Sequence, residues 1–110
     1  MGVHISFLKK YLNAGSILDY GCGYGHFLKA LQNNKFQAEG LEFDESASIK
    51  AEHYSGCKVY PVNKLINIEK NSFNVLHLGD VLEHLPNPLQ TLKKLIGILD
   101  TNGIIFIEGP

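Results

Sequence analysis

The sequence predicts an α/β fold: a doubly wound sheet of parallel strands with helices on both faces, which makes three layers. Two observations predict it. Short apolar segments of strand length alternate with segments in which apolar residues recur at helical spacing. A glycine-rich segment, residues 21–25, lies between the first strand and the helix after it. Strands joined by helices pair in parallel through right-handed crossovers, so we expect helices on both faces.

The first expected helix spans residues 3–13, because four side chains share one of its faces: His4, Phe7, Leu8 and Tyr11. Residues 17–20 follow as a short apolar strand that runs into the glycine-rich segment. Residues 26–33 are expected to form the next helix, with three apolar side chains directed inward: Phe27, Leu28 and Leu31.

Residues 37–42 are expected to form the second strand, residues 46–54 a crossover helix, and residues 58–62 the third strand. Pro61 has no backbone N–H, so it limits the third strand to short or edge pairing. The fourth strand is expected over residues 73–78. Its apolar character is typical of a strand that is buried on both faces of a parallel sheet.

A helix over residues 88–99 is expected next, because five apolar side chains recur at helical spacing: Leu89, Leu92, Leu95, Ile96 and Leu99. Asn87 suits its N-cap and Pro88 suits its first turn. The pair Asn102–Gly103 predicts a turn, and residues 104–108 are expected to form the fifth strand.

Size, charge and cysteine content narrow the class of protein. The 110 residues predict one domain over residues 1–110, and a formal net charge of −1 without a basic run argues against a nucleic-acid partner. No apolar segment approaches the ~20 residues that cross a bilayer, and the N-terminal residues do not resemble a secretory signal, so no membrane partner is expected. Neither Cys22 nor Cys57 belongs to a CxxC pair, which favours a cytoplasmic protein without disulfides. Cys22 is expected to be a small packing residue.

The glycine-rich segment is the first candidate binding element. Gly21, Gly23 and Gly25 follow the first strand and precede a helix N-terminus, so their bare backbone can touch a ligand at the point where the strand order reverses. Glu42 ends the second strand, where a carboxylate can accept hydrogen bonds from both ribose hydroxyls. Taken singly, the glycines could serve only a tight turn and Glu42 could be a solvated acid. His26 stands where a dinucleotide fingerprint needs room for a pyrophosphate, which favours a nucleoside without phosphates.

Three stretches carry a family resemblance: ILDYGCGYGHFLKAL, AEGLEFDESA and FNVLHLGDVLEHLPNPLQTLKKLIGILDTNGIIFIEGP. They resemble the class I methyltransferases that use S-adenosyl-L-methionine, in the small-molecule and ubiquinone-biosynthesis-like branch. The resemblance covers residues 17–110 and implies a Rossmann-like sheet with strand order 3-2-1-4-5. It also implies a domain truncated after the fifth strand, without the C-terminal hairpin that covers one sheet edge. We therefore expect self-association, as a homo-oligomer, through the exposed edge.

The resemblance also implies roles for individual residues. Glu42 would hold the ribose, Phe43 would pack on the adenine, and Asn63 is the weakest assignment, to the adenine amino group. The methionine moiety would lie against the first motif: Asp19, Gly21, Gly23 and Gly25. Leu78 and Gly79 end the fourth strand, where relatives place the transferable methyl group, and Asp80 would face the acceptor.

Asp80, Glu83 and His84 are the candidate catalytic residues, because positions i, i+3 and i+4 share one face of a helical turn. Some relatives use a similar E-x-x-E-H pattern to hold a divalent metal ion. Here Asp80 replaces the first glutamate and no later histidine completes a site, so a metal is not the favoured expectation. Without a metal, His84 could act as a general base. The alternative is that Glu83 and His84 only order the loop to Pro86.

The expected function is methyl transfer from S-adenosyl-L-methionine to a small-molecule acceptor, whose reacting atom the sequence does not identify. The fragment alone could lack activity, because relatives build the acceptor site from elements beyond the fifth strand. The alternatives are a noncatalytic cofactor-binding or partner-binding module and, less favoured, a nicotinamide-dependent oxidoreductase. The four remaining histidines are expected to be structural or exposed: His4, His26, His53 and His77.

Overall fold

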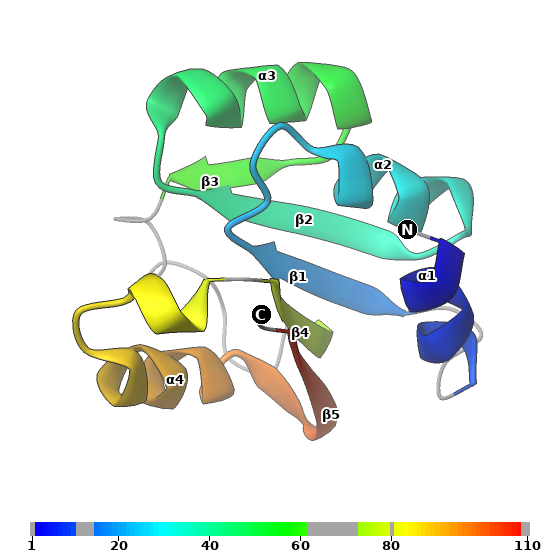
Figure 1. Cartoon of the computed structure of the whole chain (residues 1–110). Helices are drawn as coiled ribbons and strands as arrows, with labels where there is room; N and C mark the ends of the chain where they lie inside the picture. The colour runs from blue at the N-terminus through cyan, green and yellow to red at the C-terminus, as the bar shows by residue number, and fades with distance from the viewer. Residues whose placement is uncertain (1, 11–14, 62–72, 80, 109–110) are drawn as a thin grey trace.

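The computed structural model describes residues 2–10, 15–61, 73–79 and 81–108. Its strands form one parallel sheet with the order β3-β2-β1-β4-β5 (Figure 1). Helices cover both faces of this sheet, as the cartoon shows. The predicted three-layer fold and its strand order are therefore confirmed. None of the described helices is long and apolar enough to cross a membrane.

The bounds of the elements lie close to the predicted ones. The helices are α1 (Gly2–Lys9), α2 (His26–Asn33), α3 (Glu45–Ser55) and α4 (Pro88–Ile96), with a short 3-10 helix η2 (Leu82–His84). The strands are β1 (Ser16–Tyr20), β2 (Gln37–Glu42), β3 (Val59–Pro61), β4 (Phe73–Gly79) and β5 (Leu99–Glu108). The predicted ends of the first helix at residue 13 and of the third strand at residue 62 lie outside the described residues.

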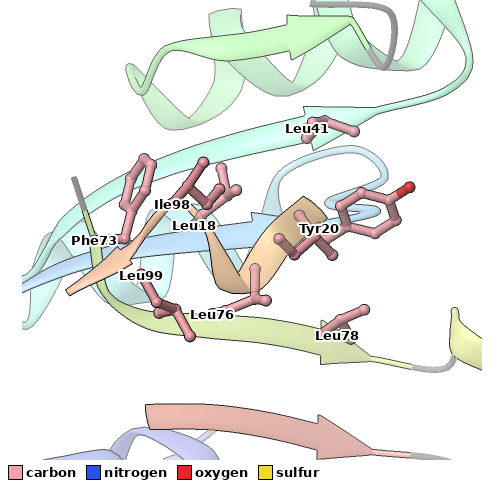
Figure 2. Packing of buried hydrophobic residues seen from close by; sticks show 9 residues of the cluster. Leu18, Tyr20, Leu41, Phe73, Leu76, Leu78, Ile98 and Leu99 are labelled. Carbon is pink, nitrogen blue, oxygen red and sulfur yellow. The ribbon is translucent and has the colours of Figure 1, made fainter. Parts of the chain in front are cut away.

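One face of the sheet packs against α4 and the turn after it. The side chains of alternate residues of β1 and β4 point to this face, because successive residues of a strand face opposite sides. Figure 2 shows the resulting core, and its buried members are Leu18, Tyr20, Leu41, Phe73, Leu76, Leu78, Leu95, Ile98 and Leu99. The burial of β4 on both faces confirms the prediction from its apolar sequence.

The opposite face packs against α1 and α2. Its buried members are Ile5, Leu8, Ile17, Phe27, Leu31, Phe36 and Val75. The inward positions predicted for α2 are confirmed, but the predicted face of α1 is only partly right. Leu8 is buried together with Ile5, whereas Phe7 is 41% exposed and stacks on Phe106 at 5.2 Å between ring centroids. Of the other residues predicted for this face, the His4 side chain and Tyr11 are outside the described part.

The predicted helix over residues 88–99 is three residues too long, because α4 ends at Ile96. The N–H groups of Gly97 and Ile98 donate to the carbonyls of Lys94 and Leu95 in a closing turn, and the next residue already begins β5. Leu99 is buried by the sheet and not by the helix, so its helical spacing was misleading. Within α4 only Leu95 is buried, while Leu89 is 66% exposed.

The predicted turn at Asn102–Gly103 lies inside β5. Phe73 pairs with Leu99 and Val75 pairs with Ile104, so residues 100–103 bulge out of the pairing opposite Asn74. A Cβ atom on Gly103 would lie 2.9 Å from the Asp100 carbonyl oxygen, which explains the glycine. The turn-forming residues thus produce a bulge within one strand, and they do not separate two elements.

Candidate functional site

The glycine loop, residues 21–25, connects β1 to α2 at the carboxyl end of the sheet. Gly21, Gly23 and Gly25 all have positive φ angles, of 78°, 58° and 91°, which are conformations that glycine adopts at little cost. The N–H groups of Gly21 and Cys22 donate to the Leu41 carbonyl at 2.7 and 3.1 Å. These bonds hold the start of the loop against the end of β2.

The three glycines meet different surroundings. A Cβ atom on Gly21 would lie 2.6 Å from Val81 Cγ2, and one on Gly25 would lie 2.9 Å from the Ala51 carbonyl oxygen in α3. A Cβ atom on Gly23 would meet nothing within 4 Å. Gly23 therefore presents bare backbone to open space. The neighbouring amides of Tyr24 and His26 donate to no acceptor in the described part of the chain, so they remain available to a ligand.

The Glu42 carboxylate lies directly against this loop. Its Oε1 accepts a hydrogen bond from the Gly23 N–H at 2.8 Å, and its Oε2 accepts one from the Asp44 N–H at 2.9 Å. Asp44 in turn caps α3 by accepting a hydrogen bond from the Ser46 N–H at 3.1 Å. Each carboxylate oxygen has a second lone pair, so Glu42 can still accept hydrogen bonds from hydroxyl groups. The glycine loop and Glu42, which the sequence predicts to share a site, are therefore adjacent.

Phe43 extends the site beyond Glu42. Its ring is 48% exposed and packs edge-on against Tyr20, with ring centroids 5.4 Å apart and an interplanar angle of 79°. One side of the ring is thus supported by the core while much of its surface remains free for a planar group. At the end of β4, the Leu78 side chain is fully buried, so only its backbone can contact a ligand. Gly79 has no side chain to offer, and a Cβ atom there would lie 2.9 Å from His77 Cε1.

A buried charged cluster lies at the carboxyl ends of β1, β4 and β5. His77 Nδ1 is 2.8 Å from Asp19 Oδ1, and His77 Nε2 is 2.6 Å from Glu108 Oε1. Burial raises the pKa of Asp19, and its contacts with His77 oppose that change. Burial alone would lower the pKa of His77, but the hydrogen bonds and charges of Asp19 and Glu108 outweigh it and raise that pKa.

Sequence reasoning missed this cluster. It assigned Asp19 to a ligand and His77 to a structural or exposed position, but it did not connect them. His77 is buried, and it faces Asp19 across the β1–β4 pairing. The sequence does place both residues near the ends of strands that are expected to be neighbours. Recognising that they face each other requires the strand register as well as the strand order.

Comparison with known proteins identifies the family to which this chain belongs. A family model described as a methyltransferase domain matches residues 4–110. The chain belongs to the methyltransferase domain family. It is 23% identical over 103 residues to a ubiquinone biosynthesis O-methyltransferase of Coxiella burnetii, which covers 88% of this chain and 44% of that protein. A Bordetella bronchiseptica protein of the same name is 27% identical over 104 residues, covering 88% and 43%. This methyltransferase domain thus spans less than half the length of these relatives.

Solved structures agree on the fold. The PH0226 protein of Pyrococcus horikoshii superposes with a TM-score of 0.80 at 24% identity, covering 94% of this chain and 54% of that one. An S-adenosylmethionine-dependent methyltransferase from Mesorhizobium loti gives a TM-score of 0.70 at 18% identity, covering 86% and 47%. At these identities the likeness concerns the architecture of the methyltransferase domain.

Two of the candidate catalytic residues of this methyltransferase domain lie on η2. Glu83 and His84 are both exposed, and the His84 N–H closes a turn by donating to the Val81 carbonyl at 2.9 Å. Asp80, the third candidate, and Asn63 are outside the described residues. Among the described residues, which do not include Asp80, no three metal-binding side chains are arranged to hold an ion.

An open cavity of about 480 Å³ lies along the first turns of α3, lined by Glu45, Ser46, Ile49 and Lys50. Its described lining includes neither the glycine loop nor Glu42. The loop geometry and the hydrogen bonds of Glu42 therefore define the candidate site of the methyltransferase domain, and this cavity lies beside it along α3.

Cys22 lies within the glycine loop but is expected to be chemically inert. Its side chain is buried against Gly40, and burial, together with the charges of Asp19 and Glu42, raises the pKa of its thiol to about 12. A thiol with this pKa has roughly 1,000-fold less reactive thiolate near neutral pH than an ordinary cysteine. Iodoacetamide should therefore leave Cys22 unmodified in the folded protein and label it after unfolding, as peptide mass mapping can measure. Rapid labelling of folded protein at Cys22 would contradict this.

Proposed function

We propose that this methyltransferase domain binds S-adenosyl-L-methionine between the glycine loop and Glu42 and supports methyl transfer to a small-molecule acceptor. The hydrogen bond between the Gly23 N–H and Glu42 Oε1 carries the proposal, because it joins open backbone and a carboxylate in one place. The name of the Mesorhizobium loti structure, an S-adenosylmethionine-dependent methyltransferase, supports the cofactor. A hydroxyl group is the first acceptor to test, since the curated relatives are named O-methyltransferases.

The residues present fit such a nucleoside. The open space at Gly23 suits a close backbone contact, as do the amides of Tyr24 and His26, which donate to no described acceptor. Glu42 would accept hydrogen bonds from the ribose hydroxyls, and the exposed Phe43 ring would pack on the adenine, with Asn63 at its amino group. Asp19, Gly21, Gly23 and Gly25 would border the methionine end, as would the ends of β4 at Leu78 and Gly79.

When bound, the cofactor supplies a methyl group that its sulfonium has already activated. The protein then contributes mainly by holding the acceptor in line with that group and by keeping water away. Asp80, Glu83 and His84 would border the acceptor, with His84 as the residue that takes the proton from a hydroxyl group. The family resemblance assigns all three roles, and the exposure of η2 supports those of Glu83 and His84.

Isothermal titration calorimetry with S-adenosyl-L-methionine and with its demethylated product tests the proposal. We expect saturable heat and a higher melting temperature with both compounds, because a ligand that binds only the folded state stabilises it. The absence of heat and of a thermal shift at millimolar ligand would reject cofactor binding. Fluorescence enhancement of NADH in the same protein would instead support a nicotinamide enzyme. Binding without transfer of a labelled methyl group to any phenol or catechol would support a noncatalytic module.

A further inference from the structure

The Asp19–His77–Glu108 cluster is a buried charged feature of the described residues, and the proposed function uses only Asp19 of its three members. Its side chains come from three neighbouring strands and are largely buried, with His77 and Asp19 at 7% and 5% exposed and Glu108 at 25%. Burying charges at this depth is costly unless they are paired with good geometry, so such a cluster calls for an explanation.

The two hydrogen bonds favour one protonation state of the cluster. A neutral imidazole can donate from only one ring nitrogen, whereas an imidazolium donates from both. His77 has a carboxylate oxygen at hydrogen-bond distance from each nitrogen, at 2.8 and 2.6 Å. Both bonds are satisfied when His77 is charged and Asp19 and Glu108 are ionised, an assignment that the raised pKa of His77 favours and the burial of Asp19 opposes.

Apart from His77, the environment of Asp19 favours its neutral, protonated form. The rings of Phe27 and Phe106 flank the imidazole, with centroids 4.6 and 5.3 Å away, and the neighbouring core from α1 and α2 is apolar among the described side chains. The charges of Glu108 and Glu42 also raise the pKa of Asp19. His77 is the one group described around Asp19 that favours its ionised form. Without His77, burial and these two charges would favour the neutral form of Asp19.

The position of the cluster connects it to the candidate site. Asp19 lies two residues before the glycine loop, and Gly79, at the end of β4, pairs with Glu108 on β5. Asp19 Oδ1 is occupied by His77, while Oδ2 makes no hydrogen bond with any described residue. An ionised carboxylate next to the loop is suited to the cationic amino group of a methionine moiety.

We propose that His77 is a positioning residue of the cofactor site: its imidazolium holds the Asp19 carboxylate ionised and in place for the cationic methionine end of the cofactor. This inference rests on the proposed function. The alternative role, a purely structural link between three strands, predicts effects on stability alone.

The pH dependence of cofactor binding tests the inference. We would measure the dissociation constant of S-adenosyl-L-methionine by calorimetry for the wild type, His77→Gln and Asp19→Asn between about pH 6 and pH 8.5. At about pH 6, His77→Gln should bind S-adenosyl-L-methionine about tenfold more weakly than the wild type does, because Asp19 is protonated in the variant at that pH. Its affinity relative to the wild type should recover as rising pH ionises Asp19. Asp19→Asn should stay weak at every pH.

His53→Gln is the matched control, since His53 is exposed on α3, and it should bind like the wild type throughout. A His77→Gln protein that melts at lower temperature but binds equally at every pH would overturn the inference, as would a deficit that does not change with pH. If no binding to the wild type is detected, the proposed function itself fails, which is a different result.

A second measurement needs no variant, so it can be made even if the His77→Gln protein does not fold. The imidazole resonances of the wild type can be titrated by NMR with and without S-adenosyl-L-methionine. A cation bound at Asp19 should lower the titration midpoint of His77, because like charges repel. At fixed pH, the resonance of the exposed His53 should keep its chemical shift when the cofactor is added. An unchanged His77 midpoint at saturating cofactor would overturn the inference.

Discussion

Glu42→Ala is expected to weaken the binding of S-adenosyl-L-methionine by at least about 100-fold. The substitution removes the acceptor of the proposed ribose hydroxyls, and hydrogen bonds to a charged group contribute about 1.5–3 kcal/mol each. It also leaves the N–H groups of Gly23 and Asp44 without the carboxylate that now accepts from them at 2.8 and 2.9 Å. The glycine loop and the start of α3 would therefore both lose the hydrogen bonds by which Glu42 holds them together. Calorimetric titration measures the effect.

Two further variants separate the ribose contacts from general effects of charge. Glu42→Gln keeps one acceptor oxygen for the Gly23 N–H, so its affinity should lie between those of the wild type and Glu42→Ala. Glu45→Gln removes an exposed carboxylate from the first turn of α3 and should bind within about twofold of the wild type. If Glu42→Ala bound the cofactor as tightly as Glu45→Gln, the ribose assignment would be wrong.

The parts of this site that the sequence predicts depend on short stretches of chain. Glycines directly after a strand predict a loop of bare backbone, and the strand order of a doubly wound sheet brings the end of β2 next to it. Both facts are local or topological, and they place Glu42 beside the loop, where the structure shows its hydrogen bond to the Gly23 N–H. The same reasoning predicted the bounds of α2 and β2 to the residue.

The parts that sequence reasoning missed depend on register and on packing from distant segments. His77 and Asp19 are 58 positions apart, and only the parallel register of β1 and β4 sets them opposite each other. Leu99 fits a helical spacing, yet the sheet buries it after Gly97 has ended α4. Asn102–Gly103 has the composition of a turn, but pairing on both sides keeps it within β5 as a bulge. In each case a tertiary contact outweighs the local signal.

Gly25→Ala is expected to destabilise the domain by about 2–4 kcal/mol. A residue with a side chain at φ 91° costs roughly 1–2 kcal/mol, and the new methyl group would lie 2.9 Å from the Ala51 carbonyl oxygen and 3.0 Å from Ala51 Cα. These atoms belong to the backbone of α3 and cannot move aside as a flexible side chain would. Urea unfolding followed by circular dichroism would measure the loss of stability.

Gly23→Ala is the matched variant, because it adds the same methyl group to the same loop where nothing lies within 4 Å. Its φ of 58° lies in the left-handed region, so the cost should be only about 1 kcal/mol and the protein should remain folded. The methyl group would occupy the space proposed for the cofactor, and binding should weaken by at least about tenfold. The two substitutions thus separate a glycine needed for packing from a glycine needed for ligand access. A Gly23→Ala protein with wild-type affinity would show that the open side of Gly23 does not face the cofactor.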